Sequence, residues 1–103
     1  MIIVIHKISA QYAVTVCGTK AYFGGGGEFD FSYLDIVQVY DAEIPGFENS
    51  PLNMGSGVAR VLLAATTVDT LVFFAGGYSY GFPVDTVDIY DTVQNTWSEE
   101  ELG

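Results

Sequence analysis

Short apolar runs alternate with clusters of Gly, Asp, Asn and Pro along the whole chain, a pattern typical of β-strands separated by turns. In residues 85–90, Val87 and Ile89 fall on one face, and Asp88 and Tyr90 fall on the other. No stretch of useful length follows the 3.6-residue period of an amphipathic helix. The pattern predicts an all-β chain with strands near residues 10–17, 20–25, 35–40 and 46–52 in the first half, and 60–67, 70–75, 85–90 and 96 onward in the second.

The first two predicted strands of each half are apolar on both faces, or nearly so, as expected for strands covered by neighbouring sheets. In the second half, Val68-Asp69 is predicted to form the tight turn between them. Residues 58–77 are apolar enough to suggest a membrane span, but Arg60 and Asp69 interrupt them. Each charge would cost about 2.5–3.5 kcal/mol at a bilayer centre, so we interpret the stretch as two buried strands.

The two halves of the chain resemble each other. Residues 21–41 read AYFGGGGEFDFSYLDIVQVYD, and residues 71–91 read LVFFAGGYSYGFPVDTVDIYD. A shift of fifty without a gap pairs Gly26-Gly27 with Gly76-Gly77, Tyr40-Asp41 with Tyr90-Asp91, and Phe47 with Trp97. A period near fifty is typical of propeller or solenoid arrays. We expect an edge segment at residues 1–8 and two equivalent four-stranded units at residues 9–53 and 54–103.

The order Gly-Gly, Tyr-Asp, Trp in AGGYSYGFPVDTVDIYDTVQNTW resembles the kelch repeat. The first copy departs from this pattern, because it has Phe47 in the Trp position and a run of glycines from Gly24 to Gly27. The resemblance implies a β-propeller in which each repeat is one four-stranded antiparallel blade. It also implies a protein-interaction module, since most family members have that role, including adaptors that present substrates to ubiquitin ligases. Some relatives are secreted or enzymatic.

Two blades do not close a ring, because propellers typically have four to eight. The outer faces are expected to expose Val61, Leu63, Val72 and Phe74, a larger apolar patch than a soluble monomer usually shows. We therefore expect an incomplete propeller that is completed by oligomerisation or is part of a longer chain. Residues 2–5 are expected to add a strand to a neighbouring chain. A structural protein that stacks its blades into a filament is the first alternative.

Charge narrows the range of partners. Three basic residues face thirteen acidic ones, for a net charge of −10, which disfavours nucleic acid and anionic membranes. We expect protein partners, including copies of the chain itself, and a glycan is the alternative. Cys17 is the single cysteine, which excludes a disulfide within the chain and favours a cytoplasmic over an extracellular location.

Two groups of residues are predicted to bind partners. The loops after each Gly-Gly alternate aromatic with polar residues, which suits a binding rim. In kelch propellers this loop lies on the face most used for partners. Polar residues at the position that Ser56 and Arg60 occupy here often face the central channel of those propellers. The alternatives are that the rings cover blade edges and that Arg60 pairs with an inter-blade acid. The predicted residues are Phe29, Phe31, Tyr33, Tyr78, Tyr80, Phe82, Ser56 and Arg60.

The sequence favours a non-catalytic protein with no cofactor and no metal. His6 is the only histidine, and no Ser or Cys is clearly tied to it as a nucleophile. The glycine run is not a phosphate loop, because no Lys-Ser/Thr follows it. Calcium binding by Glu28, Asp30 and Asp35 is an alternative, although their spacing does not match the EF-hand pattern. A carboxylate pair for glycoside hydrolysis stays open, so the second alternative is a glycan-binding or hydrolytic propeller.

Overall fold

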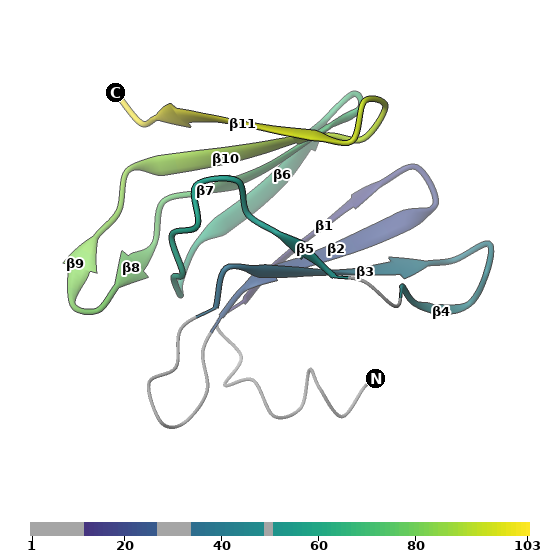
Figure 1. Cartoon of the computed structure of the whole chain (residues 1–103), viewed down its shortest axis with the longest axis horizontal. Helices are drawn as coiled ribbons and strands as arrows, with labels where there is room; N and C mark the ends of the chain where they lie inside the picture. The colour runs from purple at the N-terminus through teal and green to yellow at the C-terminus, as the bar shows by residue number, and fades with distance from the viewer. Residues whose placement is uncertain (1–11, 27–33, 49–50) are drawn as a thin grey trace.

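The computed structural model describes residues 12–26, 34–48 and 51–103, and within them the protein is all-β (Figure 1). The first sheet has the order β1-β2-β3, and β4 and β5 both pair with β3 in the fourth position. The second sheet has the order β11-β10-β7-β6, and β8 and β9 form a separate hairpin. All strand pairings are antiparallel. The strands are β1 (Tyr12–Cys17), β2 (Lys20–Gly25), β3 (Ile36–Asp41), β4 (Gly46–Phe47), β5 (Leu52–Asn53), β6 (Ala64–Val68), β7 (Leu71–Ala75), β8 (Tyr78–Ser79), β9 (Phe82–Pro83), β10 (Thr86–Asp91) and β11 (Thr96–Glu101).

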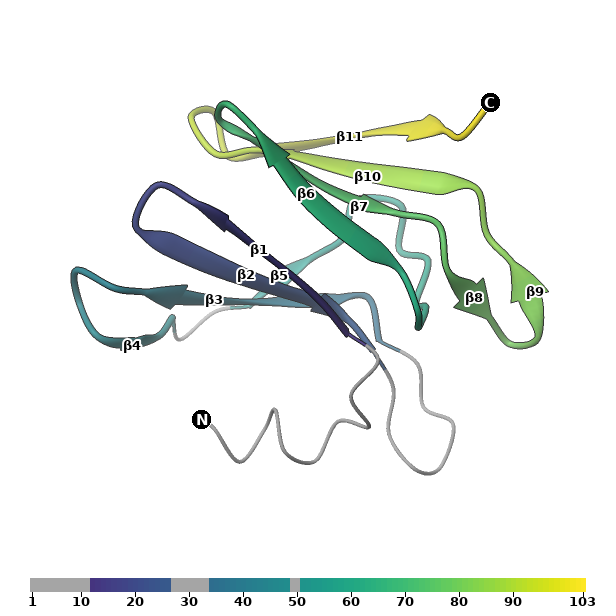
Figure 2. The ribbon, with the colours of Figure 1, turned by 180° about the vertical axis from the view of Figure 1, so that it is seen from behind.

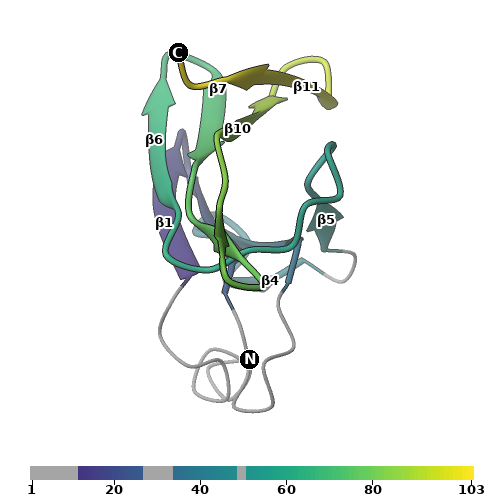
Figure 3. The same cartoon turned by 90° about the vertical axis from the view of Figure 1, so that its left-hand side faces the viewer.

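The prediction of two four-stranded antiparallel sheets is confirmed. The two sheets stack face to face, with β1 beside β6, and the chain crosses from one to the other after β5 (Figures 2 and 3). Thr15 Oγ1 and Thr67 Oγ1 lie 2.8 Å apart and join β1 to β6, which are edge strands of their sheets. The stacking therefore places one face of each sheet in a common interior.

The predicted first strand of the second sheet begins too early. Residues 60–67 were expected, but β6 begins at Ala64. Val61 instead exchanges two 2.9 Å backbone hydrogen bonds with Tyr78, and Leu62 has a φ of 58°. The backbone before Ala64 is thus hydrogen-bonded to the β8–β9 hairpin and does not extend β6. The turn that follows β6 lies at Asp69-Thr70 rather than Val68-Asp69, because Asp69 takes a φ of 57°, which Asp tolerates.

The two repeats do not align without a gap. The glycine doublets with matching positive φ are Gly25-Gly26, at 73° and 96°, and Gly76-Gly77, at 69° and 99°. These doublets are 51 positions apart, whereas Tyr40–Phe47 and Tyr90–Trp97 occupy matching cross-strand pairs 50 apart. The segment between the doublet and the third strand is therefore one residue longer in the first sheet. Pairing Gly26-Gly27 with Gly76-Gly77 was wrong, since positive φ defines the doublet.

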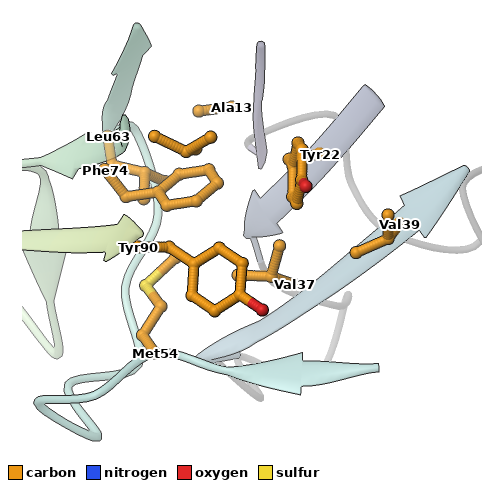
Figure 4. Packing of buried hydrophobic residues seen from close by; sticks show 9 residues of the cluster. Ala13, Tyr22, Val37, Val39, Met54, Leu63, Phe74 and Tyr90 are labelled. Atoms are coloured by element: carbon orange, nitrogen blue, oxygen red, sulfur yellow. The ribbon is translucent and has the colours of Figure 1, made fainter. Parts of the chain in front are cut away.

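The hydrophobic core lies between the sheets, where Tyr22 and Phe74 face each other from β2 and β7 (Figure 4). The expectation that Val61, Leu63, Val72 and Phe74 are exposed on outer faces was wrong, because all four are buried. The residues that alternate with them on β7, Leu71 and Phe73, lie on the outer face and are half-buried. The core consists of Ala13, Tyr22, Val37, Val39, Met54, Leu63, Val72, Phe74 and Tyr90.

Candidate functional site

A fully buried ion pair fixes the approach to β6. Arg60 Nη1 lies 2.9 Å from Asp88 Oδ2, and both side chains have 0 % exposure. Arg60 also donates to the backbone oxygens of Val58 at 2.9 Å, Phe74 at 2.9 Å and Gly76 at 2.8 Å. The N–H groups of the guanidinium therefore donate to acceptors within the protein. A buried charge that is both paired and hydrogen-bonded in this way is stable in the interior.

Ser56 completes the same network. Its backbone N–H donates to Asp88 Oδ1 at 2.8 Å, and its hydroxyl donates to Asp88 Oδ2 at 2.8 Å. Both carboxylate oxygens of Asp88 therefore have partners within the protein. Asp88 belongs to β10 of the second sheet, whereas Ser56 and Arg60 lie in the crossover segment between β5 and β6. The geometry therefore lets Ser56 and Arg60 hold the crossover segment against the second sheet.

The β8–β9 hairpin presents aromatic rings at the surface. Tyr78, Tyr80 and Phe82 are 46 %, 63 % and 73 % exposed. Tyr80 and Gly81 form the turn with φ values of 51° and 89°, as a two-residue hairpin turn requires. The backbone of Tyr78 is bonded to Val61, and Ser79 Oγ donates to Ala59 O at 2.8 Å. The hairpin is thus anchored at its base while its rings face solvent. Phe29, Phe31 and Tyr33 lie outside the described residues.

A second aromatic group lies on the outer face of the first sheet. The ring centroids of Phe23 and Phe47 are 5.7 Å apart, and those of Tyr40 and Phe47 are 5.4 Å apart. We call Phe23, Tyr40 and Phe47 the outer triad. All three rings are half-buried and face away from the second sheet. The sequence alone did not identify this surface.

The outer triad has a buried counterpart in the second sheet. Phe74, Tyr90 and Trp97 occupy the equivalent positions, with centroid distances of 6.5 Å from Phe74 to Trp97 and 4.9 Å from Tyr90 to Trp97. These three residues, which we call the inner triad, pack against the first sheet. The same ring arrangement therefore lies between the sheets in one case, with Phe74 and Tyr90 buried and Trp97 half-buried, and faces away from the partner sheet in the other. Side chains alternate between the two faces of a strand. This alternation and the strand register place Phe23 and Tyr40 on the outer face, and together they are the signal that locates the outer triad.

A polar cleft opens between the sheets beside the β1–β2 turn. It measures about 300 Å³, and its lining includes Cys17, Lys20, Tyr22, Glu48 and Tyr90. The 2.8 Å hydrogen bond from Lys20 Nζ to Glu48 raises the pKa of Lys20. Burial raises the pKa of both Tyr22 and Tyr90 above 10.0, so both phenols are neutral at physiological pH. The cleft therefore offers hydrogen-bonding groups, and the charge of Lys20 within it is paired with that of Glu48.

Metal-ligating clusters and membrane-spanning helices can be assessed within residues 12–26, 34–48 and 51–103. Within these ranges, no cluster of three or more His, Cys, Asp or Glu side chains is placed to hold a metal ion. Of the residues weighed for calcium, Glu28 and Asp30 lie outside the described residues. Those same ranges hold no helix of the length and apolarity needed to cross a bilayer. The predicted edge segment at residues 1–8 also lies outside them.

Two comparisons with known proteins identify relatives. The family model described as Kelch motif matches residues 59–100. Kelch-like protein 23 from Homo sapiens is 32 % identical over 89 residues, covering 84 % of this chain. The same protein from Pongo abelii is 30 % identical over 88 residues, also covering 84 % of this chain. The alignment spans only 15 % of the length of each of these relatives.

Proposed function

Because the chain belongs to the kelch motif family through residues 59–100, we propose that it is a non-catalytic protein-binding module whose outer sheet faces join further blades. Those blades belong either to copies of the chain or to a longer propeller. The observation that supports the proposal is the outer triad, which repeats on the outer face of the first sheet the ring arrangement that packs between the sheets. Apolar side chains of this size stabilise a protein mainly when water is removed from them.

Solution mass tests the joining of blades. We expect the isolated chain to associate weakly, so that it sediments above its monomer mass of 11.1 kDa only at high micromolar concentration. Phe23→Ser should shift the mass back toward the monomer, because the substitution removes an outer ring and leaves the inner triad intact. Val93→Ser is the matched control, since Val93 is 70 % exposed in the turn after β10. A mass of 11.1 kDa at every concentration, unchanged by Phe23→Ser, would contradict the association of copies through the outer triad.

The β8–β9 hairpin is the proposed site for other protein partners. The rings of the hairpin are exposed, and its base is held by hydrogen bonds to Val61 and Ala59. Binding of a partner would therefore cost little entropy for ordering the hairpin. For peptides selected from a displayed library against the intact chain, Phe82→Ser should weaken binding about tenfold, as expected for loss of an aromatic anchor. The melting temperature should stay unchanged, because Phe82 is 73 % exposed.

The hairpin experiment uses the same surface control. Val93→Ser removes an equally exposed apolar side chain at the opposite end of β10 and should leave peptide affinity unchanged. If peptides bind the Phe82→Ser and Val93→Ser chains with equal affinity, the hairpin is not the partner site.

A further inference from the structure

We propose that the outer triad docks onto a blade that carries glycine opposite Phe23, and that a second copy of this chain meets the requirement only poorly. The inference rests on the proposed function and names the partner of that same surface. It follows from the one sheet-to-sheet contact that the structure contains, which shows what an aromatic triad needs on the facing sheet.

The contact between the sheets depends on a missing side chain. Phe74, which is fully buried, packs directly on the backbone of Gly24 in β2. A Cβ atom built at Gly24 would lie 2.5 Å, 2.8 Å and 2.9 Å from three carbons of the Phe74 ring. Real Cβ atoms do not approach carbon so closely, and the ring is enclosed by the core. The inner triad therefore requires glycine at this position to reach its packed distance.

Phe23 takes the place of Phe74 in the outer triad. Both residues lie in the second strand of their sheet, two positions before the glycine doublet with matching positive φ. Both also contact the aromatic residue of the fourth strand, which is Phe47 in one sheet and Trp97 in the other. The first sheet covers the inner triad and leaves space for Phe74 at Gly24. A blade that covers the outer triad in the same way must therefore leave equivalent space in front of Phe23.

A second copy would present the outer face of its second sheet. The positions there match the inner face of the first sheet closely in size, except that Ala75 stands where Gly24 stands. The Ala75 methyl group would occupy the volume that Phe23 needs, and the two sheets would be held apart. The inner face of the first sheet presents Ala13, Tyr22, Gly24, Val37 and Val39, and the outer face of the second presents Ala64, Phe73, Ala75, Val87 and Ile89 at equivalent positions.

Charge points the same way. Each copy carries a net charge of −10, so two copies repel each other at low ionic strength. The acidic strand β11, with Glu99, Glu100 and Glu101 exposed, lies in the sheet that a copy would use for docking. A glycine-bearing blade with a smaller negative charge fits the outer triad better in both shape and charge.

The test removes the Ala75 methyl group from one chain and measures its docking on the outer triad of the wild-type chain. Phe23→Ser chains, which cannot dock through their own outer triad, are labelled and titrated with the wild-type chain while fluorescence anisotropy is recorded. The labelled chain carries Ala75, Ala75→Gly, or Ala64→Gly as the matched control. Ala64 is the direct cross-strand neighbour of Ala75 on the same face, and its equivalent Ala13 is also alanine, so its removal creates no new fit.

We expect Ala75→Gly to tighten binding to the wild-type chain about tenfold or more, because an overpacked contact is relieved. Ala64→Gly should not tighten it. Equal affinity for the Ala75 and Ala75→Gly chains, or an equal gain with Ala64→Gly, would overturn the inference. Either result would leave the proposed function intact provided that wild-type association still depends on Phe23. Thermal unfolding of each labelled chain verifies that the glycine substitutions preserve the fold.

Discussion

Replacing Asp88 with alanine is expected to lower the free energy of unfolding by about 3–5 kcal/mol, the usual cost of leaving one member of a buried ion pair alone. Arg60 would keep its bonds to three backbone oxygens but would hold an uncompensated charge at 0 % exposure. The N–H and hydroxyl of Ser56 would also lose their acceptors. A domain of this size is typically stable by about 5–15 kcal/mol, so the variant should approach the limit of folding.

Urea unfolding at a fixed protein concentration measures the effect of the Asp88 substitution. Asp91→Ala is the matched control on the same strand, because the Asp91 carboxylate accepts hydrogen bonds from the turn N–H groups of Val93 and Gln94 at the protein surface. That change should cost about 1 kcal/mol, as for an ordinary hydrogen-bonded turn. Equal losses for the two variants would show that the buried pair does not hold the crossover segment in place.

Asp88→Asn tests whether charge or shape matters at this position. Both carboxylate oxygens accept hydrogen bonds from donors of Ser56, and Oδ2 also accepts from Arg60. An asparagine amide would therefore direct its NH₂ group at a donor in either orientation. We expect Asp88→Asn to be nearly as destabilising as Asp88→Ala, and full stability of the Asn variant would argue that the carboxylate charge is unimportant.

The sequence was sufficient to predict the sheets, because short apolar runs and turn residues specify strands locally. It was not sufficient to predict which face of each strand is buried. Val72 and Leu71 are similarly apolar, so only the folded structure, in which Val72 is buried and Leu71 is half-buried, shows that Val72 faces the first sheet. The alternation argument has no polar residue to orient it on such strands. For this reason the exposed surface was assigned to Val72 and Phe74 rather than to the outer triad.

The site shows the same limit. The segment after Gly76-Gly77 was predicted as an aromatic loop, and the structure forms it into the β8–β9 hairpin with its turn at Tyr80-Gly81. Its role in partner binding stays a prediction. Arg60 was recognised as unusual within an apolar run. Its partner could not be chosen, because Asp88 lies 28 positions away and alternates with apolar residues as a solvent-facing acid would. Long-range pairing of a buried charge requires the fold.

Introducing a methyl group at Gly24 is expected to lower the free energy of unfolding by about 1–3 kcal/mol, the range for overpacking a core. The alanine Cβ would lie 2.5 Å from a carbon of the Phe74 ring, while Gly24 itself has no positive φ that alanine would strain. Alanine in a strand would otherwise gain roughly 0.5–1 kcal/mol over glycine by reducing backbone entropy. The sign of the measured change therefore separates steric overlap from backbone effects.

A double-mutant cycle with Phe74→Leu isolates the contact between Gly24 and Phe74. Leucine removes the ring carbons that the new methyl group would meet, so Gly24→Ala should cost less in the Phe74→Leu background than in the wild-type chain. We expect this difference to be about 1 kcal/mol or more, measured by urea unfolding of all four chains at one concentration. If Gly24→Ala cost the same in both backgrounds, the glycine would not be required by the aromatic ring, and the space expected in front of Phe23 would lose its structural basis.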